Sequence, residues 1–169
     1  MRRGAALMAL VLMLLTAGCR QSTQTADPVG TDFTCRIQAD YKDMAVEGTL
    51  VRQTAGALKL TFSAPESLAG MSAVWDGESV KLEMGGLSFS VDPATVPESA
   101  LGEEIMAVLD AAIRGEGNRT QEDGKLVLRG NGEHGAYELL CDVQTGIPLS
   151  LSVPSLPLAV TFSQVEQTQ

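Results

Sequence analysis

Apolar and polar residues alternate along most of the chain from residue 33 onward. A two-residue period places successive side chains on opposite faces, so it predicts β-strands that are buried on one face. The first run extends from Phe33 to Tyr41. The apolar positions of the later runs are Met44, Val46 and Leu50; Leu58, Leu60 and Phe62; Val80, Leu82 and Met84; Leu87, Phe89 and Val91; Leu126 and Leu128; Tyr137, Leu139, Cys141 and Val143; Leu149, Leu151 and Val153; and Leu158, Val160 and Phe162.

Short glycine-containing turns separate these runs. Glycine accepts the positive φ that tight two-residue hairpins require, so consecutive strands are predicted to pair antiparallel. The turns are Ala55-Gly56, Asp76-Gly77, Gly85-Gly86, Asp123-Gly124, Asn131-Gly132 and Thr145-Gly146.

The apolar period changes once, between about residues 96 and 114, where it becomes that of an amphipathic helix. Thr95 and Glu98 form a capping box at its start, and Gly115 is a suitable stop. The predicted buried face holds Leu101, Ile105, Val108, Leu109, Ala112 and Ile113, and the predicted solvent face holds Glu103, Glu104 and Asp110.

These elements predict a mainly β (α+β) fold. Ten or eleven strands with one apolar face cannot stay flat, because strand twist accumulates and curls the sheet toward its buried side. We therefore expect a curved antiparallel meander sheet, or unclosed β-barrel, wrapped on the one helix. The residues predicted to line its apolar concavity are Leu60, Phe62, Leu82, Phe89, Ile105, Leu109 and Leu151.

The first 18 residues have the layout of a signal peptide: Arg2 and Arg3, an apolar run from Ala5 to Leu15, and small residues before Cys19. Eleven apolar residues rise roughly 16 Å as a helix, about half of a bilayer's hydrocarbon core. The segment Leu15-Thr16-Ala17-Gly18-Cys19 resembles a bacterial lipobox, although Thr16 occupies the usual leucine position. The expectation is a lipid on Cys19 that anchors the chain to the extracytoplasmic face of the cell membrane; the alternative is an ordinary secretory signal.

Residues 19–32 would then be the lipidated cysteine and a flexible tether, because they are rich in Gln, Ser and Thr and carry almost nothing to bury. Without the leader, and so without Arg2 and Arg3, the chain has 10 basic and 21 acidic residues, a net charge of −11. This excess argues against nucleic acid as a partner and against direct adhesion to anionic lipid.

Two further cysteines, Cys35 and Cys141, fall on apolar strand faces. In an oxidising compartment they could form a disulfide, or each could be a separately buried thiol that packs as a small hydrophobe. Neither neighbourhood has the electropositive character of a reactive thiolate.

Three stretches carry a resemblance to a known family. They are Phe62-Ser63-Ala64-Pro65-Glu66-Ser67-Leu68-Ala69-Gly70, then Trp75-Asp76-Gly77-Glu78-Ser79-Val80-Lys81-Leu82, and Gly85-Gly86-Leu87. With the order of strands, helix and strands, they resemble the LolA/LolB-like lipoprotein superfamily, and most closely the small germination-type lipoproteins of spore-forming bacteria. The resemblance implies an unclosed β-barrel over residues 33–165. It also implies either shielding of acyl chains or, in the spore-former group, binding to other envelope proteins.

A catalytic constellation is not evident. The single histidine, His134, lies in a glycine-rich stretch beside Glu133 and is either a solvated turn residue or an acid/base or metal group. Trp75 is either an exposed anchor for a partner or a core residue. The sequence has no zinc-type Cys/His spacing, nucleophile elbow or phosphate loop, so no enzyme activity, metal or cofactor is expected.

The leading hypothesis is a non-enzymatic envelope lipoprotein that acts as a binding or accessory protein for another envelope protein. The alternative is a lipid- or lipoprotein-binding module that holds an acyl chain in its apolar concavity. A core filled by Ile105, Leu109 and Ile113 would favour the first, and an open acyl-sized cavity the second. An unpaired sheet edge would offer a further route to a partner or to a homodimer.

Overall fold

The computed structural model describes residues 32–53, 56–92 and 99–167. The predicted leader, the lipidated Cys19, the predicted tether except Asp32, Ala55 of a predicted turn, and the Thr95–Glu98 capping box lie outside these residues. The described strands are β1 (Phe33–Tyr41), β2 (Met44–Arg52), β3 (Leu58–Ala64), β4 (Ser72–Trp75), β5 (Val80–Met84), β6 (Leu87–Val91), β7 (Asn118–Glu122), β8 (Lys125–Gly132), β9 (Gly135–Asp142), β10 (Pro148–Val153) and β11 (Leu158–Gln167), and the helix is α2 (Ser99–Ile113).

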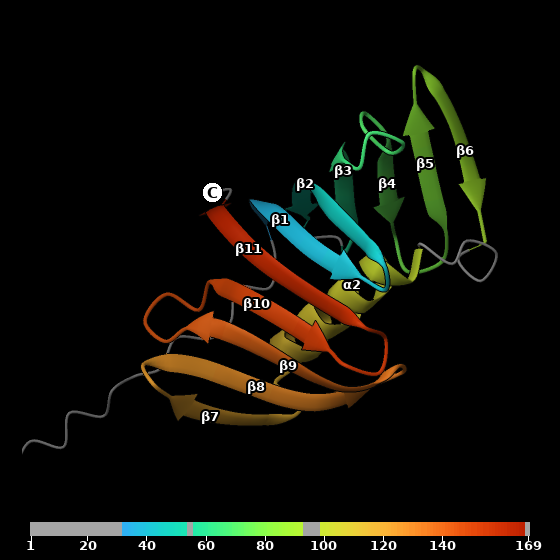
Figure 1. The fold of residues 1–169 in the computed structure, drawn as a ribbon. Coiled ribbons are helices and arrows are strands. Elements are labelled where there is room, and N and C mark those ends of the chain that lie inside the picture. The colour runs from blue at the N-terminus through green and yellow to red at the C-terminus, as the bar shows by residue number, and fades with distance from the viewer. Residues whose placement is uncertain (1–31, 54–55, 93–98, 168–169) are drawn as a thin grey trace, which may run out of the picture.

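The strands form one 11-stranded sheet in the order β6-β5-β4-β3-β2-β1-β11-β10-β9-β8-β7. Every pairing is antiparallel, and all but one joins strands that are consecutive in the sequence. The exception is β1 with β11, which joins the two ends of the meander in the middle of the sheet (Figure 1). Strands β6 and β7 remain as unpaired edges, so the predicted fold of a curved, unclosed sheet is confirmed.

Two strands of the structure, β4 and β7, do not correspond to any of the alternating apolar runs identified in the sequence. β4 has only four residues, too few for a period to stand out. β7 reads Asn-Arg-Thr-Gln-Glu and is largely exposed, so it has no apolar face. It forms because the Asp123-Gly124 turn returns the chain against β8, where both turn residues adopt positive φ.

The glycine turns fall near the predicted positions, with one shift. Gly85 and Gly86 both have positive φ and close the β5–β6 hairpin between Met84 and Leu87. The β8–β9 hairpin, however, pairs Gly132 with Gly135, so its tip is Glu133-His134 instead of the predicted Asn131-Gly132. This shift places the only histidine of the chain at a hairpin tip.

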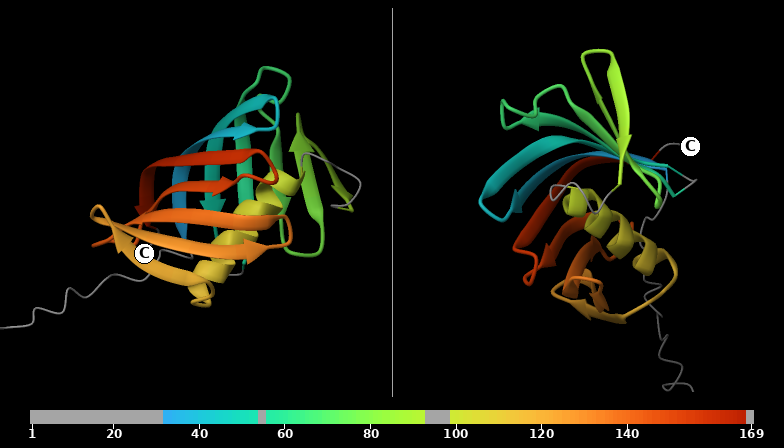
Figure 2. Two further views of the ribbon diagram at one scale, coloured as in Figure 1. Left: turned by 60° about the horizontal axis from the view of Figure 1, so that its bottom comes forward. Right: turned by 90° about the vertical axis from the view of Figure 1, so that its right-hand side faces the viewer.

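Helix α2 lies across the concave face of the sheet and connects the edge strand β6 to the opposite edge strand β7 (Figure 2). The two halves of the sheet curl toward the helix from either side. Ile105 and Leu109 are 0% and 1% exposed and belong to the same core cluster as the inner faces of the strands. Full burial of such a side chain stabilises the fold by about 1.5–3 kcal/mol.

The predicted faces of the helix were wrong at Ile113 and Glu104, and the two other residues predicted on its solvent face, Glu103 and Asp110, are half-buried. Ile113 is 45% exposed at the last residue of α2, beyond the sheet's cover. Glu104 is only 2% exposed, because the sheet curls far enough to bury the margin of the apolar stripe as well as its centre. Asp110 is half-buried, because a side chain from β2 reaches it.

That side chain is Arg52, the last residue of β2, which is among the most buried side chains of the protein. Its guanidinium donates to the Asp110 carboxylate on α2 and to the carbonyl of Gly56. Arg52 follows Leu50 by two residues, so it occupies a position that faces the core. The ion pair thus links the sheet to the helix where the alternation pattern would have an apolar residue.

We expect Asp110→Ala to lower the free energy of unfolding by about 2–4 kcal/mol, because it leaves the Arg52 charge inside the protein without its carboxylate partner. Urea denaturation of the two proteins measures the difference. Asp43→Ala, at an exposed position in the β1–β2 turn, is the control and should change stability by less than about 0.5 kcal/mol. A loss that small for Asp110→Ala would contradict a role for the ion pair.

Candidate functional site

The concave face is the first candidate site, because the sequence predicts an apolar concavity there. Five of its seven predicted lining residues are at most 7% exposed; they are Leu60, Phe62, Ile105, Leu109 and Leu151. All five belong to one core cluster that includes residues of both the helix and the sheet. The middle of the concave face is therefore occupied by the side chains of α2.

The remaining two predicted residues, Leu82 and Phe89, lie where the inner face extends beyond the core. They are cross-strand partners on β5 and β6. Leu82 is half-buried and Phe89 is 54% exposed. Because alternate residues of a strand share a face, Met84 and Leu87 lie on the same inner side, and they are 55% and 73% exposed.

We call the exposed group of Met84, Leu87 and Phe89 the β5–β6 apolar patch.

The two edge strands of the sheet differ in charge, because β7 carries charged side chains. Its Glu122 accepts hydrogen bonds from Arg129 at 2.6 and 3.0 Å, and these bonds lower the pKa of the Glu122 carboxyl to about 2. β6 reads Leu-Ser-Phe-Ser-Val and carries no charge. Charged residues discourage an edge strand from pairing with another chain, so only β7 has this protection.

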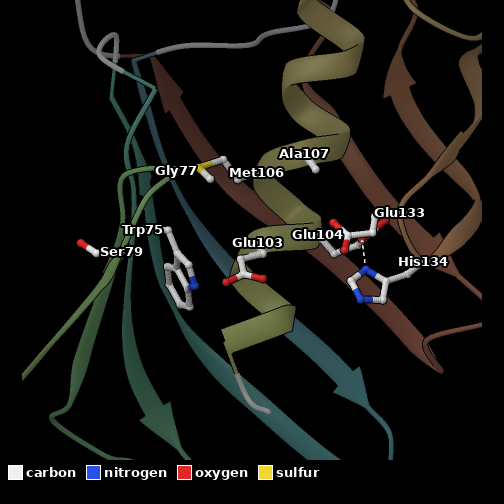
Figure 3. A pocket seen from close by; sticks show the side chains of 9 residues that line it. All are labelled: Trp75, Gly77, Ser79, Glu103, Glu104, Met106, Ala107, Glu133 and His134. Carbon is white, nitrogen blue, oxygen red and sulfur yellow. Dashed lines mark hydrogen bonds and ion pairs between the residues drawn. The ribbon is translucent and has the colours of Figure 1, made fainter. Parts of the chain in front are cut away.

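A second candidate site is a cavity of about 310 Å³ between the helix and two hairpins (Figure 3). Glu103, Glu104, Met106 and Ala107 of α2 form one side of it. Trp75, Gly77 and Ser79 come from the β4–β5 hairpin, and Glu133 and His134 come from the tip of the β8–β9 hairpin. The curl of the sheet thus brings together two hairpins that are far apart in the strand order.

Trp75 is a core residue, because it is only 2% exposed. Its ring packs against Gly102 of α2 so closely that a Cβ at position 102 would overlap the indole. The β4–β5 turn beside it is held by Asp76, whose carboxylate accepts the backbone N–H groups of Glu78 at 2.9 Å and Ser79 at 2.7 Å. These bonds lower the pKa of Asp76.

His134 is held from two directions. Its Nδ1 lies 2.9 Å from Glu104 Oε2, within hydrogen-bonding distance. Its backbone carbonyl accepts a hydrogen bond from the Ser155 hydroxyl, in the turn between β10 and β11. In the sequence His134 stands beside Glu133, whereas the structure pairs the histidine with Glu104 of the helix.

Among the residues that line this cavity, Glu104 was wrongly predicted to face solvent. Its spacing in the helix already indicated burial. It lies three residues after Leu101 and four before Val108, both buried, so it adjoins the apolar stripe of the helix. One of its oxygens, Oε1, is buried and has no hydrogen-bond partner.

In the described part of the chain, no group of three or more His, Cys, Asp or Glu side chains is arranged to hold a metal ion. No helix among these residues has both the length and the apolar character needed to cross a membrane.

Cys35 and Cys141 are free, buried thiols on β1 and β9. The disulfide alternative is not formed in this structure, because β11 and β10 lie between the two strands. Three strand spacings amount to about 14 Å along the sheet, whereas disulfide-linked Cα atoms lie about 4.4–6.8 Å apart. Burial raises the pKa of each thiol to about 12.

Comparison with known proteins finds similarity at the level of structure. No family model matches the chain. No curated protein matches it by sequence. An uncharacterised conserved protein from Thermus thermophilus is similar in structure with a TM-score of 0.52 at 11% identity, over 83% of this chain and 81% of that one. This likeness concerns the fold alone.

Two further solved structures are similar at lower scores. A LolA superfamily protein from Nitrosomonas europaea has a TM-score of 0.43 at 11% identity, over 85% of this chain and 89% of that one. A putative outer membrane lipoprotein-sorting protein domain from Vibrio parahaemolyticus has a TM-score of 0.39 at 8% identity, over 85% and 88% of the two chains.

The cysteines lead to a test in the Cys19→Ala variant, in which Cys35 and Cys141 are the only thiols. At pH 8 we expect iodoacetamide to label both at least about 100-fold more slowly in the native protein than in denaturant, because raised pKa values and burial suppress the thiolate. The raised pKa also means that stability falls as pH rises from about 9 toward 12, since deprotonation favours the unfolded chain. Fast labelling of either native thiol would contradict its burial.

Proposed function

We propose that this chain is a membrane-anchored, extracytoplasmic lipoprotein that acts without catalysis, by binding another envelope protein. The lipid on Cys19 would hold it at the membrane, and residues 19–32 would tether the folded domain. The partner would contact the uncovered inner face of β5 and β6 and add an extended segment along the β6 edge. The LolA/LolB-like resemblance of the sequence agrees with this role.

The observation that carries the proposal is the filled concave face. Ile105 and Leu109 occupy its middle at 0% and 1% exposure, which favours partner binding over storage of an acyl chain. Ile113, the third helix residue expected in that core, is exposed, but it lies at the end of α2. What stays open to a partner is the surface on which Met84, Leu87 and Phe89 extend the inner face beyond the helix.

The difference between the two sheet edges supports the same conclusion. An edge strand presents backbone N–H and C=O groups to solvent and can accept a further strand unless charges or bulges prevent it. β6 carries no charged residue, and its pairing with β5 is regular, without a bulge. Strand addition supplies main-chain hydrogen bonds, and alternate side chains of the added segment could then contact the β5–β6 apolar patch.

We expect Phe89→Lys to abolish capture of a stoichiometric partner when the full-length chain is isolated from solubilised membranes of its native host. A lysine at this position guards the edge and places a charge on the apolar surface. The measurement is quantitative mass spectrometry of the captured proteins, with cross-links mapped onto the chain. Gln121→Lys on the charged edge β7 is the matched control and should retain the partner.

Native mass spectrometry of the same material distinguishes three possibilities: another protein, a second copy of this chain, or an acyl lipid. A hetero-complex that Phe89→Lys removes and Gln121→Lys retains supports the proposal. A doubled mass of this chain alone would replace it with a homodimer. A stoichiometric acyl lipid on the wild-type chain would replace it with lipid binding.

The anchor has its own test. We expect Cys19→Ala to move the chain from the membrane fraction to the soluble fraction of a lipoprotein-processing host, because the thioether-linked lipid can no longer form. Fractionation and the mass of the mature N-terminal peptide give the readout. Ser22→Ala, in the tether, should leave the chain membrane-bound. A soluble wild-type chain cleaved before an unmodified cysteine would establish the ordinary secretory signal instead.

A further inference from the structure

Strand β6 is the uncharged edge of the sheet (Figure 1), and its pairing with β5 determines which of its backbone groups face outward. The turn between the two strands is Gly85-Gly86, with both residues at positive φ, and Met84 pairs with Leu87 directly beside it. A two-residue hairpin of this kind closes on a pair that exchanges two backbone hydrogen bonds. Along an antiparallel ladder such pairs alternate with pairs that exchange none.

The backbone groups of two serines are therefore available to a further strand. Because Leu87 is hydrogen-bonded to β5, Phe89 and Val91 are bonded to it as well, at intervals of two residues. The N–H and C=O groups of Ser88 and Ser90 point the other way, toward the free edge. A strand added to β6 makes its main-chain hydrogen bonds with these two residues.

The side chains of β6 determine the pattern of the added segment. Leu87 and Phe89 belong to the inner face and are 73% and 54% exposed, whereas Ser88 and Ser90 belong to the outer face. In an antiparallel addition the residue opposite Phe89 is not hydrogen-bonded to it, and in such pairs the Cα atoms are only about 4.5 Å apart. An apolar side chain at that place packs against the phenyl ring. The best-fitting segment therefore alternates, with apolar residues on the inner face and polar residues on the outer face.

The two ends of β6 differ in charge. The glycine turn at its start is uncharged, whereas the exposed Asp92 follows its last residue, Val91. Val91 pairs with Val80, which directly follows the β4–β5 turn, and Glu78 in that turn is also exposed. The end of β6 that lies beside this turn is therefore acidic.

The only lysine of β5 does not offset these carboxylates, because Lys81 is bound to Glu83 at 2.7 Å. The chain without its leader also carries 10 basic and 21 acidic residues, a net charge of −11. A basic segment is therefore attracted over a distance as well as at the edge itself. In an antiparallel addition the N-terminal end of the segment lies beside Val91, so its basic residues come before the apolar ones.

We propose that the β6 edge binds a protein segment that is extended, antiparallel to β6, apolar at alternate positions and preceded by lysine or arginine. Ser88 and Ser90 supply the main-chain hydrogen bonds, and the inner face of β6 supplies the apolar contacts. Every pairing within the sheet is antiparallel, so the added strand continues its pattern. This inference rests on the proposed function and names the chemistry of the partner.

The probe is the peptide acetyl-Lys-Lys-Val-Thr-Val-Thr-Val-amide, titrated calorimetrically into the full-length chain in phosphatidylcholine nanodiscs. We expect saturable binding, with empty nanodiscs as the blank. The shuffled peptide acetyl-Lys-Lys-Val-Val-Thr-Thr-Val-amide has the same composition without the alternation and should bind at least about tenfold more weakly. Glu-Glu in place of Lys-Lys should weaken binding by about threefold or more at about 50 mM NaCl, and by less at about 500 mM, because salt screens the attraction.

N-methylation of the peptide separates strand addition from apolar contact alone. In the proposed register the N–H groups of the two threonines point toward Ser88 and Ser90, and those of the valines point away. Methylating both threonine nitrogens should weaken binding by at least about tenfold, because two main-chain hydrogen bonds are lost. Methylating two valine nitrogens is the matched control and should change binding by less than about threefold.

Ser90→Pro makes the same test in the chain itself. The N–H that it removes faces the free edge, so the β5–β6 ladder is kept, and proline is tolerated on that side of an edge strand. We expect it to weaken peptide binding by at least about tenfold, with little change in the melting temperature. Ser90→Ala keeps the N–H and should bind like the wild type. The methylated peptides test the wild-type chain, so the inference stays testable even if Ser90→Pro does not fold.

The results distinguish this inference from the proposed function. Pattern-selective binding that threonine methylation and Ser90→Pro weaken, and that valine methylation and Ser90→Ala retain, supports strand addition at β6. No saturable binding, equal binding of the shuffled peptide, or equal loss from both methylated peptides would overturn it. So would a doubled mass of this chain that the peptide does not dissociate, because a second copy would then occupy the edge.

Capture from the host membranes supplies the remaining comparison. An envelope protein that Phe89→Lys releases and Ser90→Pro retains would mean that the proposed function is right and strand addition is wrong. Peptide binding as expected, without any captured envelope protein, would mean that the β6 edge has this chemistry and the proposed function is wrong.

Discussion

Burial of the concave sheet face by α2 is the interaction on which the rest of this structure depends. One antiparallel sheet of 11 strands has a single apolar side, and that side must be covered. A closed barrel would cover it with its own strands, whereas here the helix that connects β6 to β7 lies against it. The helix thus holds the two halves of the sheet in a curl around itself, and the edges remain apart.

This arrangement explains where polar groups enter the interior. The curl brings strands and hairpins against the flanks of the helix as well as against its apolar stripe. Arg52 meets Asp110 on one flank, and His134 meets Glu104 on another. Such groups can be buried only when they are paired, so these contacts add directional restraints that apolar packing lacks. One oxygen of Glu104, Oε1, is buried without a hydrogen-bond partner and is an exception to this rule.

The helix is also shorter than the surface it would need to cover. Its 15 residues rise roughly 22 Å, and the inner face of the β5–β6 hairpin continues beyond the core. The apolar alternation of Leu87, Phe89 and Val91 is that of a buried strand, yet Leu87 and Phe89 are exposed. β6 thus has the pattern of a covered strand at an edge of the sheet, it carries no charge, and these two features are the physical basis for the proposed partner binding at this end of the molecule.

The amino-acid sequence by itself determined the elements: the period of two, the change of period near residues 96–114, and the glycine turns define a curled meander on one helix. These features are local, since each depends on residues a few positions apart. It could not place β4, which has only four residues, or β7, which has no apolar face, nor could it separate the covered Ile105 from the exposed Phe89. Only the tertiary structure decided that Glu104 faces His134, that Arg52 reaches Asp110, and that β11 and β10 separate the strands of Cys35 and Cys141. Those pairings depend on how far the sheet curls, a sum of small twists over 11 strands that no single stretch of sequence encodes.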